Sequence, residues 1–123
     1  MRESEQLKDE DLFNAIGQIT LNFKILECDK CAKAIMQWLA QKRIKGKVIR
    51  LRTASSRQFH IISERLEQKG IRESITDNGV HYGVEVRGRV FDNLSAEGLP
   101  KEQWLKDFHC PTEQFIFEEL DKL

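Results

Sequence analysis

The sequence lacks any apolar run that approaches the ~20 residues needed for a membrane-spanning helix. Its first stretch, MRESEQLKDEDLF, is dominated by charged residues and contains no apolar core of a secretory signal. We therefore expect a cytoplasmic protein that has no membrane partner. Export by a specialised route that uses no cleavable signal is compatible with the same pattern.

An excess of charge of either sign is also missing, because 20 lysine and arginine residues balance 20 aspartate and glutamate residues. This balance removes the electrostatic reason to expect a nucleic acid as partner. Only two prolines and seven glycines occur, and 40% of the residues are hydrophobic, which is typical of a globular domain and excludes a disordered chain. We expect a single domain over residues 1–123, since this length allows one hydrophobic core.

Helical spacing of apolar residues dominates the first third of the chain. Residues 4–20 and 28–45 carry apolar side chains every three to five positions, which predicts two amphipathic helices, and Gly46 follows the second. Near the other end, Pro100 and Pro111 are each placed to open a short helix. The chain is therefore expected to begin and end with helices.

Strand patterns fill the middle of the sequence. Residues 47–53 and 80–93 alternate apolar and polar side chains, which predicts a strand and a hairpin. Residues 59–76 are ambiguous, with a short helix ending at Gly70 and a strand over 72–76 as the best assignment. Helices, then strands, then short helices indicate an α+β fold.

The predicted hairpin places a polar pair on one face. A two-residue turn at Arg87 and Gly88 sets Gly83 opposite Asp92, and His81 then lies one diagonal step from Asp92. At roughly 7 to 8 Å between backbones, the two side chains are within reach of a hydrogen bond, and Gly83 leaves the space open. A carboxylate beside an imidazole orients a general base. The residue types alone favour a structural role in the turns, so the pair needs a nucleophile to indicate catalysis.

Cysteine is scarce, and the three thiols are too few and odd in number for a disulfide framework. Cys28 stands at the start of a predicted helix, where the helix dipole favours a thiolate and free backbone N–H groups can bind an oxyanion. Cys31, one turn later, falls on the apolar face and is expected to pack or to support the site. Cys110, beside His109, is expected to be structural. Cys28 is therefore the preferred nucleophile.

Two other interpretations of the cysteines stay open. A Cys-x-x-Cys pair at a helix start is used by thiol-disulfide oxidoreductases, in which Cys28 would attack and Cys31 would resolve the mixed disulfide. The second interpretation is a zinc site formed by this pair together with His109 and Cys110. Against it, the pair runs straight into a helix without the glycine turn of a zinc knuckle. Our preferred interpretation uses neither a metal nor a cofactor.

The order Cys28, His81, Asp92 along the chain is that of papain-like cysteine enzymes. More specifically, the chain resembles the small papain-fold toxin domains of bacterial polymorphic toxin systems, in particular the second papain-fold toxin family, common in cyanobacteria. The resemblance rests on the stretches ECDKCAKAI, KGKVIRL, SITDNGVHYGVEVRGRVFDN and EGLPKEQWLKDF. It runs from about Phe23 to Phe108, with an N-terminal and a C-terminal helix as additions.

The resemblance implies a papain-like cysteine protease fold, with N-terminal helices and the nucleophile helix packed on a small antiparallel sheet. It implies a cysteine hydrolase or transferase of peptidase or glutamine deamidase type, with a protein or peptide substrate and an immunity protein as partners. Cys28 would be the nucleophile, His81 the general base and later acid, and Asp92 the residue that orients the imidazole.

Three further residues are candidates for oxyanion binding or support: Asn22, Cys31 and Asn93. The alternative functions are a thiol-disulfide oxidoreductase and a binding module with a decayed site.

Overall fold

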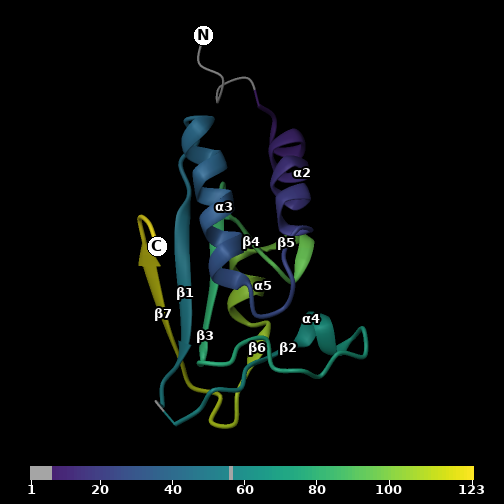
Figure 1. Ribbon diagram of the computed structural model, residues 1–123, viewed down its shortest axis with the longest axis vertical. Helices are drawn as coiled ribbons and strands as arrows, with labels where there is room; N and C mark the ends of the chain where they lie inside the picture. Colours follow the sequence, from purple (N-terminus) through teal and green to yellow (C-terminus); the bar gives the residue numbers. More distant parts are fainter. Residues whose placement is uncertain (1–6, 56) are drawn as a thin grey trace.

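The computed structural model describes residues 7–55 and 57–123 and has the predicted α+β architecture. Two helices, α2 (Asp9–Thr20) and α3 (Cys28–Gln41), lie on one face of an antiparallel sheet with the strand order β5-β4-β3-β1-β7 (Figure 1). The start of the helix predicted over 4–20 lies partly outside the described residues. None of the described helices is long and apolar enough to cross a membrane. The strands of the sheet are β1 (Lys47–Thr53), β3 (Val80–Val86), β4 (Arg89–Asp92), β5 (Ser95–Pro100) and β7 (Phe115–Leu120).

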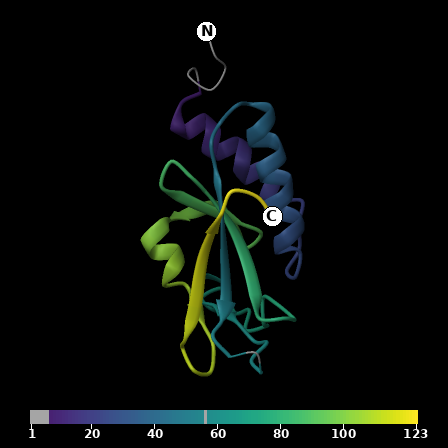
Figure 2. The same ribbon diagram turned by 90° about the vertical axis from the view of Figure 1, so that its left-hand side faces the viewer.

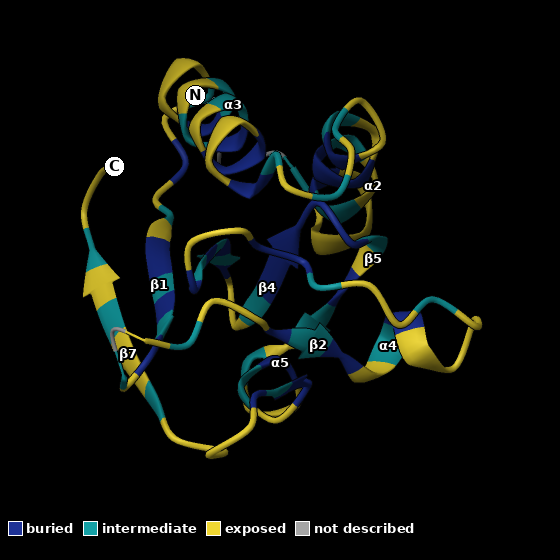
Figure 3. Cartoon of the chain, turned by 60° about the horizontal axis from the view of Figure 1, so that its bottom comes forward, coloured by how far each residue is buried: buried dark blue, intermediate teal, exposed yellow. Residues whose placement is uncertain are grey.

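One hydrophobic core fills the space between the two helices and the sheet. Side chains three or four positions apart share a face of a helix, so each helix turns one apolar stripe towards the strands. In Figure 3, the residues between the helices and the sheet are coloured as buried. The buried members of this core are Leu12, Ile16, Cys31, Ala32, Ile35, Leu39, Ile44, Val84, Val86 and Phe91.

A second core covers the opposite face of the sheet, so the expectation of one hydrophobic core is wrong: a sheet that is covered on both faces encloses two. Short elements close it: the strands β2 (Ile62–Ser63) and β6 (Phe108–His109), which pair with each other, and the helices α4 (Glu64–Glu67) and α5 (Lys101–Leu105). Figure 2 shows α3 and α5 on opposite sides of the sheet. The buried members of this second core are Ile49, Leu51, Ile61, Leu66, Ile75, Val90, Leu94, Trp104 and Phe108.

Helix α3 ends before the predicted boundary at Gly46. Arg43 adopts a left-handed conformation with φ of 58°, and the Ile44 N–H donates to the Leu39 carbonyl at 2.9 Å. This Schellman arrangement satisfies the last carbonyl groups, with an arginine in the position where glycine is usual. Gly46 has a packing role instead, because a Cβ there would lie 2.6 Å from a Leu39 methyl group.

The segment between β1 and β3 forms less regular structure than predicted. The short helix exists but ends at Glu67, and Gly70 follows with φ of 84°. Residues 72–76 form no strand, so that prediction is wrong. Within them the Ser74 hydroxyl accepts the Ile61 N–H at 3.1 Å, and such side-chain bonds to the backbone replace a strand ladder.

The C-terminal helix predicted after Pro111 is also wrong, although Pro100 opens α5 as expected. The last described element is the strand β7, which pairs with β1 along its whole length. Strand β1 would otherwise be a sheet edge, and its Arg50 forms a cross-strand ion pair of 2.7 Å with Glu118. Pairing with a long-range partner therefore overrides the local helical pattern.

Candidate active site

The hairpin of β3 and β4 forms with the predicted register. Arg87 and Gly88 occupy the turn with φ of 51° and 84°, and Val84 pairs with Phe91. Two positive φ values are typical of a type I′ turn, whose twist matches that of paired strands. Because side chains alternate along a strand, Phe91 enters the core under the helices and Asp92 points to the opposite face.

His81 and Asp92 meet on this opposite face, which confirms the predicted contact. His81 Nε2 donates to Asp92 Oδ2 at 3.0 Å, and both side chains are fully buried. An ionised carboxylate only accepts hydrogen bonds, so Nε2 carries a proton in this contact. The other ring nitrogen, Nδ1, is buried without a hydrogen-bond partner among the described residues. Such an atom is rare in a folded protein, and it leaves Nδ1 free to exchange a proton.

Cys28 begins α3, as predicted, and its side chain lies beside the imidazole. The thiol is close enough to His81 to contribute to the rise in the pKa of that histidine. Its Sγ also donates a weak hydrogen bond to the Val80 carbonyl at 4.0 Å, and only 7% of Cys28 is exposed. The structure thus brings together the three residues Cys28, His81 and Asp92, which are far apart in the sequence.

A pocket of about 370 Å³ opens beside Cys28. Its walls come from the start of α3 and from the segment that leads into β3, and they are mainly polar. A second hollow of about 270 Å³ shares Asn78 and Val80 with it and extends towards the end of β1. Residues that line the first pocket with Cys28 include Asp29, Lys30, Thr76, Asp77 and Tyr82.

The start of α3 offers backbone N–H groups around Cys28. The first N–H groups of a helix have no acceptor within it, and Glu27 at the N-cap makes no side-chain capping hydrogen bond to them. The helix dipole adds a partial positive charge at the same end. Together these features can stabilise negative charge on a substrate oxygen held beside Cys28.

Asn93 fixes the loop that precedes Cys28. Its Nδ2 donates to the Lys24 carbonyl at 2.7 Å, which ties the loop between α2 and α3 to the end of β4. Leu26 in the same loop has φ of 78°, a conformation that is costly for a residue other than glycine. Contacts such as that of Asn93 hold the loop in this shape, which gives its predicted supporting role a physical basis.

Asn22 lies away from the pocket. Its Nδ2 donates to the Gln18 carbonyl at 3.4 Å, its side chain is exposed, and it does not line the pocket at Cys28. The turn after α2 explains this position, because the Asn22 N–H bonds to the Ile19 carbonyl at 3.1 Å. The geometry therefore gives no support to Asn22 as an oxyanion donor.

Cys31 is fully buried between α3 and the sheet. Burial, and then the charges of Asp92 and Cys28, raise the pKa of Cys31 to about 12. A thiol with such a pKa stays protonated near neutral pH and is a poor nucleophile. The helical position of Cys31 thus leads to packing, as predicted, and favours Cys28 as the reactive thiol.

Cys110 and His109 have local partners. Cys110 Sγ contacts Thr112 Oγ1 and the Gln114 carbonyl, both at 3.7 Å, and His109 Nδ1 bonds to Glu113 at 2.6 Å. In the part of the chain that the structure describes, no group of three or more His, Cys, Asp or Glu side chains is arranged to hold a metal ion. The zinc alternative therefore has no ligand cluster there.

Three further residues hold Asp92, and the sequence alone does not assign them to the site. Arg65 makes a two-point contact, from Nη1 to Oδ1 at 3.1 Å and from Nη2 to Oδ2 at 2.8 Å. Trp104 Nε1 donates to Oδ2 at 2.9 Å, and the Leu94 N–H donates to Oδ1 at 3.0 Å. Asp92 is therefore held from several directions as a buried, ionised acceptor.

The sequence carries different amounts of information about these residues. Arg65 lies in a charged stretch, SERLEQK, that looks like a solvated helix, so nothing local indicates that it is buried. Trp104 is expected to pack, and it is fully buried. A buried tryptophan also needs an acceptor for its indole N–H, and this requirement is the signal that connects Trp104 with a buried carboxylate.

The space above Gly83 is filled, contrary to the prediction that it is open. A Cβ at Gly83 would lie 2.8 Å from the Trp104 indole and 2.7 Å from a Val90 methyl group. The absence of a side chain therefore lets the indole lie against β3 and reach Asp92. Gly83 serves the site indirectly, by making room for a hydrogen-bond donor.

We expect Gly83→Ala to lower the free energy of unfolding by about 1–3 kcal/mol, because the added methyl overpacks the site against the indole. Urea unfolding followed by tryptophan fluorescence measures this cost. In a Trp104→Phe background the smaller ring leaves more room, so the same change should cost less. An equal cost in both backgrounds would show that the indole does not set the requirement for glycine.

The buried charges of the site stabilise one another. Burial favours protonation of Asp92, but the neighbouring Arg65 and then His81 hold the pKa of its carboxyl well below the usual range. Burial lowers the pKa of His81, but the hydrogen bond with Asp92 and the interaction with Cys28 outweigh it and raise that pKa to about 9. Near neutral pH the site therefore contains an Asp92 carboxylate and a His81 imidazolium.

We expect folding stability to fall as the pH rises from about 6.5 to about 9. The pKa of His81 is about 9 in the folded chain, above its ordinary value of 6.5. Protonation of His81 therefore contributes fully to folding stability below pH 6.5, and this contribution is lost as the pH rises to about 9. The loss is on the order of 3 kcal/mol. Urea unfolding at several pH values measures it. In His81→Gln the free energy of unfolding should no longer fall over this pH range. An unchanged fall would contradict the assignment of the pH dependence to His81.

The fold and the site together define a class of protein: an α+β domain in which a cysteine at a helix start lies beside a histidine and an aspartate on a sheet hairpin, as in papain-like folds. A family model described as papain fold toxin 2 matches residues 11–109, and the chain belongs to this family. No curated protein and no solved structure matched the chain. The resemblance and the fold predicted from the sequence are thus confirmed, and the match starts inside α2 rather than at Phe23.

Proposed function

We propose that this papain-fold toxin domain is a cysteine hydrolase or transferase that acts on peptide or side-chain amide bonds. One observation carries the proposal: His81 donates through Nε2 to Asp92, and its other nitrogen is buried without a hydrogen-bond partner in a ring that lies beside the Cys28 thiol. A nucleophile, a base and a residue that orients the base are the components of covalent catalysis by cysteine.

In the first half of the proposed reaction, His81 Nδ1 holds the proton of the Cys28 thiol, and the thiolate sulfur forms a bond to the carbonyl carbon of the amide. The electron pair of the carbonyl moves to its oxygen, which the N–H groups at the start of α3 stabilise. The C–N bond then breaks, and the proton on His81 passes to the leaving nitrogen. The products are an amine or ammonia and a thioester on Cys28.

In the second half, neutral His81 takes a proton from water, and the oxygen attacks the thioester carbon. The C–S bond breaks, the proton returns to the sulfur of Cys28, and a carboxylic acid is released. Asp92 stays ionised throughout and keeps the Nε2 proton in place, so Nδ1 remains on the side of the thiol. An amine that replaces water gives transfer instead of hydrolysis.

The hollow beside Cys28 and the second hollow that adjoins it support a polypeptide substrate. The first, of about 370 Å³, has room for the residue that bears the amide, and the second, of about 270 Å³, has room for a neighbouring residue. Attack on a main-chain amide makes the domain a peptidase, and attack on a glutamine side chain makes it a deamidase. We also propose an immunity protein as its partner and the cytoplasm as its site of action, where reducing conditions keep the three cysteines free.

The test is incubation of the purified chain with a bacterial cell lysate, followed by mass spectrometry of the lysate proteins. New N-termini indicate a peptidase, glutamate in place of glutamine indicates a deamidase, and new cross-links between glutamine and lysine indicate a transferase. Each product should appear with the wild-type chain and be absent with Cys28→Ala and His81→Ala. Absence of all three products with the wild-type chain contradicts the proposal. A Cys28 to Cys31 disulfide and thiol exchange that is unaffected in His81→Ala would support the oxidoreductase alternative.

A further inference from the structure

Arg65 lies behind the pair of His81 and Asp92 and takes no direct part in the proposed reaction. Its side chain is largely buried, with 13% exposed. Besides the two-point contact with Asp92, it donates to Ser95 Oγ at 2.7 Å and through Nε to Asp107 Oδ2 at 2.8 Å. The guanidinium therefore bridges two buried carboxylates, of which only one touches the histidine.

The second carboxylate, Asp107, holds α4 and its arginine in place. Asp107 Oδ1 accepts the backbone N–H of Arg65 at 3.0 Å, and its Oδ2 accepts the Ser63 hydroxyl at 2.5 Å. The Asp107 carbonyl also accepts the Glu64 N–H at 2.8 Å. Since backbone and side chain of Arg65 bind the same residue, the guanidinium has a single favoured position against Asp92.

We propose that Arg65 is a positioning residue of the active site, which holds the Asp92 carboxylate in place and shares its charge, so that Asp92 orients His81 without locking it in the protonated form. The inference rests on the proposed function of Cys28 and His81. Its geometric basis is a row of neighbouring side chains that runs from a thiol to an imidazole, a carboxylate, a guanidinium and a second carboxylate. The members of this row are Cys28, His81, Asp92, Arg65 and Asp107.

The second half of the proposed reaction explains why such sharing matters. Neutral His81 must take a proton from water there, and a carboxylate with no other partner would stabilise the imidazolium most strongly. Arg65 reduces this stabilisation, whereas Asp107 restores part of it at a longer range. Cys28 and Cys31 on α3 are the other titratable groups that act on the pair, and Cys31 is protonated near neutral pH.

The test compares Arg65→Gln with Arg65→Lys by nitrogen NMR titration of the His81 imidazole. Arg65→Gln should raise the titration midpoint of His81 by about one pH unit, which is a tenfold increase in proton affinity. Arg65→Lys keeps the charge, so the midpoint should stay near that of the wild type. Loss of the two-point contact should still slow conversion of the amide substrate about tenfold or more in Arg65→Lys.

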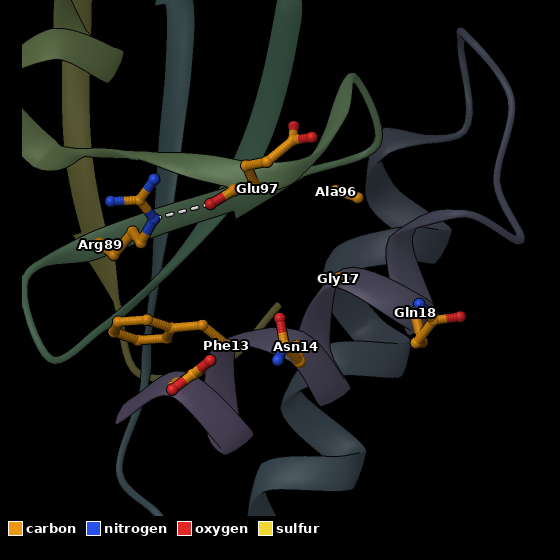
Figure 4. A pocket seen from close by; sticks show the side chains of 8 residues that line it. Phe13, Asn14, Gly17, Gln18, Arg89, Ala96 and Glu97 are labelled. Atoms are coloured by element: carbon orange, nitrogen blue, oxygen red, sulfur yellow. Dashed lines mark hydrogen bonds between the residues drawn. The ribbon is translucent and has the colours of Figure 1, made fainter. Parts of the chain in front are cut away.

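The matched control is Arg89→Gln. Arg89 lies on the same strand as Asp92, but its side chain is on the other face of the sheet, beside α2, where it donates to the Glu97 carbonyl at 2.6 Å (Figure 4). Removal of this arginine should change neither the His81 midpoint nor the rate of substrate conversion. The control thus separates the loss of any arginine from the loss of the one that binds Asp92.

A second variant keeps the inference testable if Arg65→Gln does not fold. Arg65→Gln combined with Asp107→Asn removes one positive and one negative charge, so the net charge behind His81 equals that of the wild type. Its midpoint should lie between those of Arg65→Gln and the wild type, because Asp107 acts on His81 at a longer range than Arg65. A folded Arg65→Gln or Arg65→Gln/Asp107→Asn protein that departs from these expectations, including a lowered midpoint in the single variant, overturns the inference. If Cys28 fails to react with iodoacetamide while the His81 midpoints of the variants follow these expectations, the result supports the role of Arg65 and contradicts only the proposed function.

Discussion

Cys28→Ala is expected to abolish alkylation of the folded chain near neutral pH and to remove conversion of amide substrates. Alanine has no atom that can attack a carbonyl carbon, and loss of the nucleophile from a catalytic triad lowers kcat on the order of 10⁶-fold. Cys31 is fully buried, and Cys110, which is about as buried as Cys28, lies at no helix start and contacts Thr112 Oγ1 and the Gln114 carbonyl. We therefore expect neither to take over the reaction with iodoacetamide. Mass spectrometry of the intact chain after exposure to this reagent measures the number of alkyl groups added.

The matched control for this prediction is Cys31→Ala, which removes the neighbouring thiol on the same helix and should keep the label. Unfolding of Cys28→Ala in denaturant should expose Cys31 and Cys110 and allow two labels, which would show that the folded structure protects both thiols from the reagent. Labelling of folded Cys28→Ala at the wild-type rate would remove Cys28 from the role of nucleophile.

Asp92→Asn should cause the second large loss, on the order of 10⁴-fold in kcat, because the imidazole loses the acceptor that sets its tautomer. Either orientation of an asparagine amide would turn an NH₂ group towards N–H donors, since Arg65 donates to both carboxylate oxygens. Loss of one partner of a buried ion pair should also lower the free energy of unfolding by about 3 kcal/mol. Loss of the carboxylate charge should lower the pKa of His81, since Asp92 is the main cause that raises it.

Two measurements separate catalysis from folding in this variant. Urea unfolding gives the free energy, and substrate conversion below the unfolding transition gives the rate for folded protein. Asp11→Asn, on the exposed first turn of α2, is the control for loss of one carboxylate and should match the wild type in both. A folded Asp92→Asn protein with a rate within tenfold of the wild type would contradict the orienting role of Asp92.

The parts of the fold that follow local rules could be predicted from the sequence. The turn at Arg87 and Gly88 fixes the pairing of its two strands, and pairing in turn places His81 near Asp92. The helix start at Cys28 follows from the apolar spacing after it. Each of these inferences needs only neighbours in the chain, and a hairpin register or a helical face is determined by them.

The errors fall where distant segments compete with local pattern. The final stretch FIFEEL joins the sheet as β7 because β1 offers an edge and two arginines that pair with Glu118, and no local rule contains these partners. Asn22 precedes Cys28 by six residues and was a candidate oxyanion donor, but the turn after α2 directs its amide to a carbonyl of that helix. Spacing along a loop therefore does not define direction in space.

The sequence by itself determined the α+β class, the helix start at Cys28 and the hairpin that carries His81 and Asp92, because local periodicity and turn chemistry specify where helices and hairpins begin. Its motifs carried the resemblance to the family. Only the tertiary structure decided what surrounds the carboxylate. Arg65 and Trp104 reach Asp92 from separate short helices, and a buried charge must be matched by whatever donors the fold brings to it. That requirement acts through space, so it leaves no pattern in the chain.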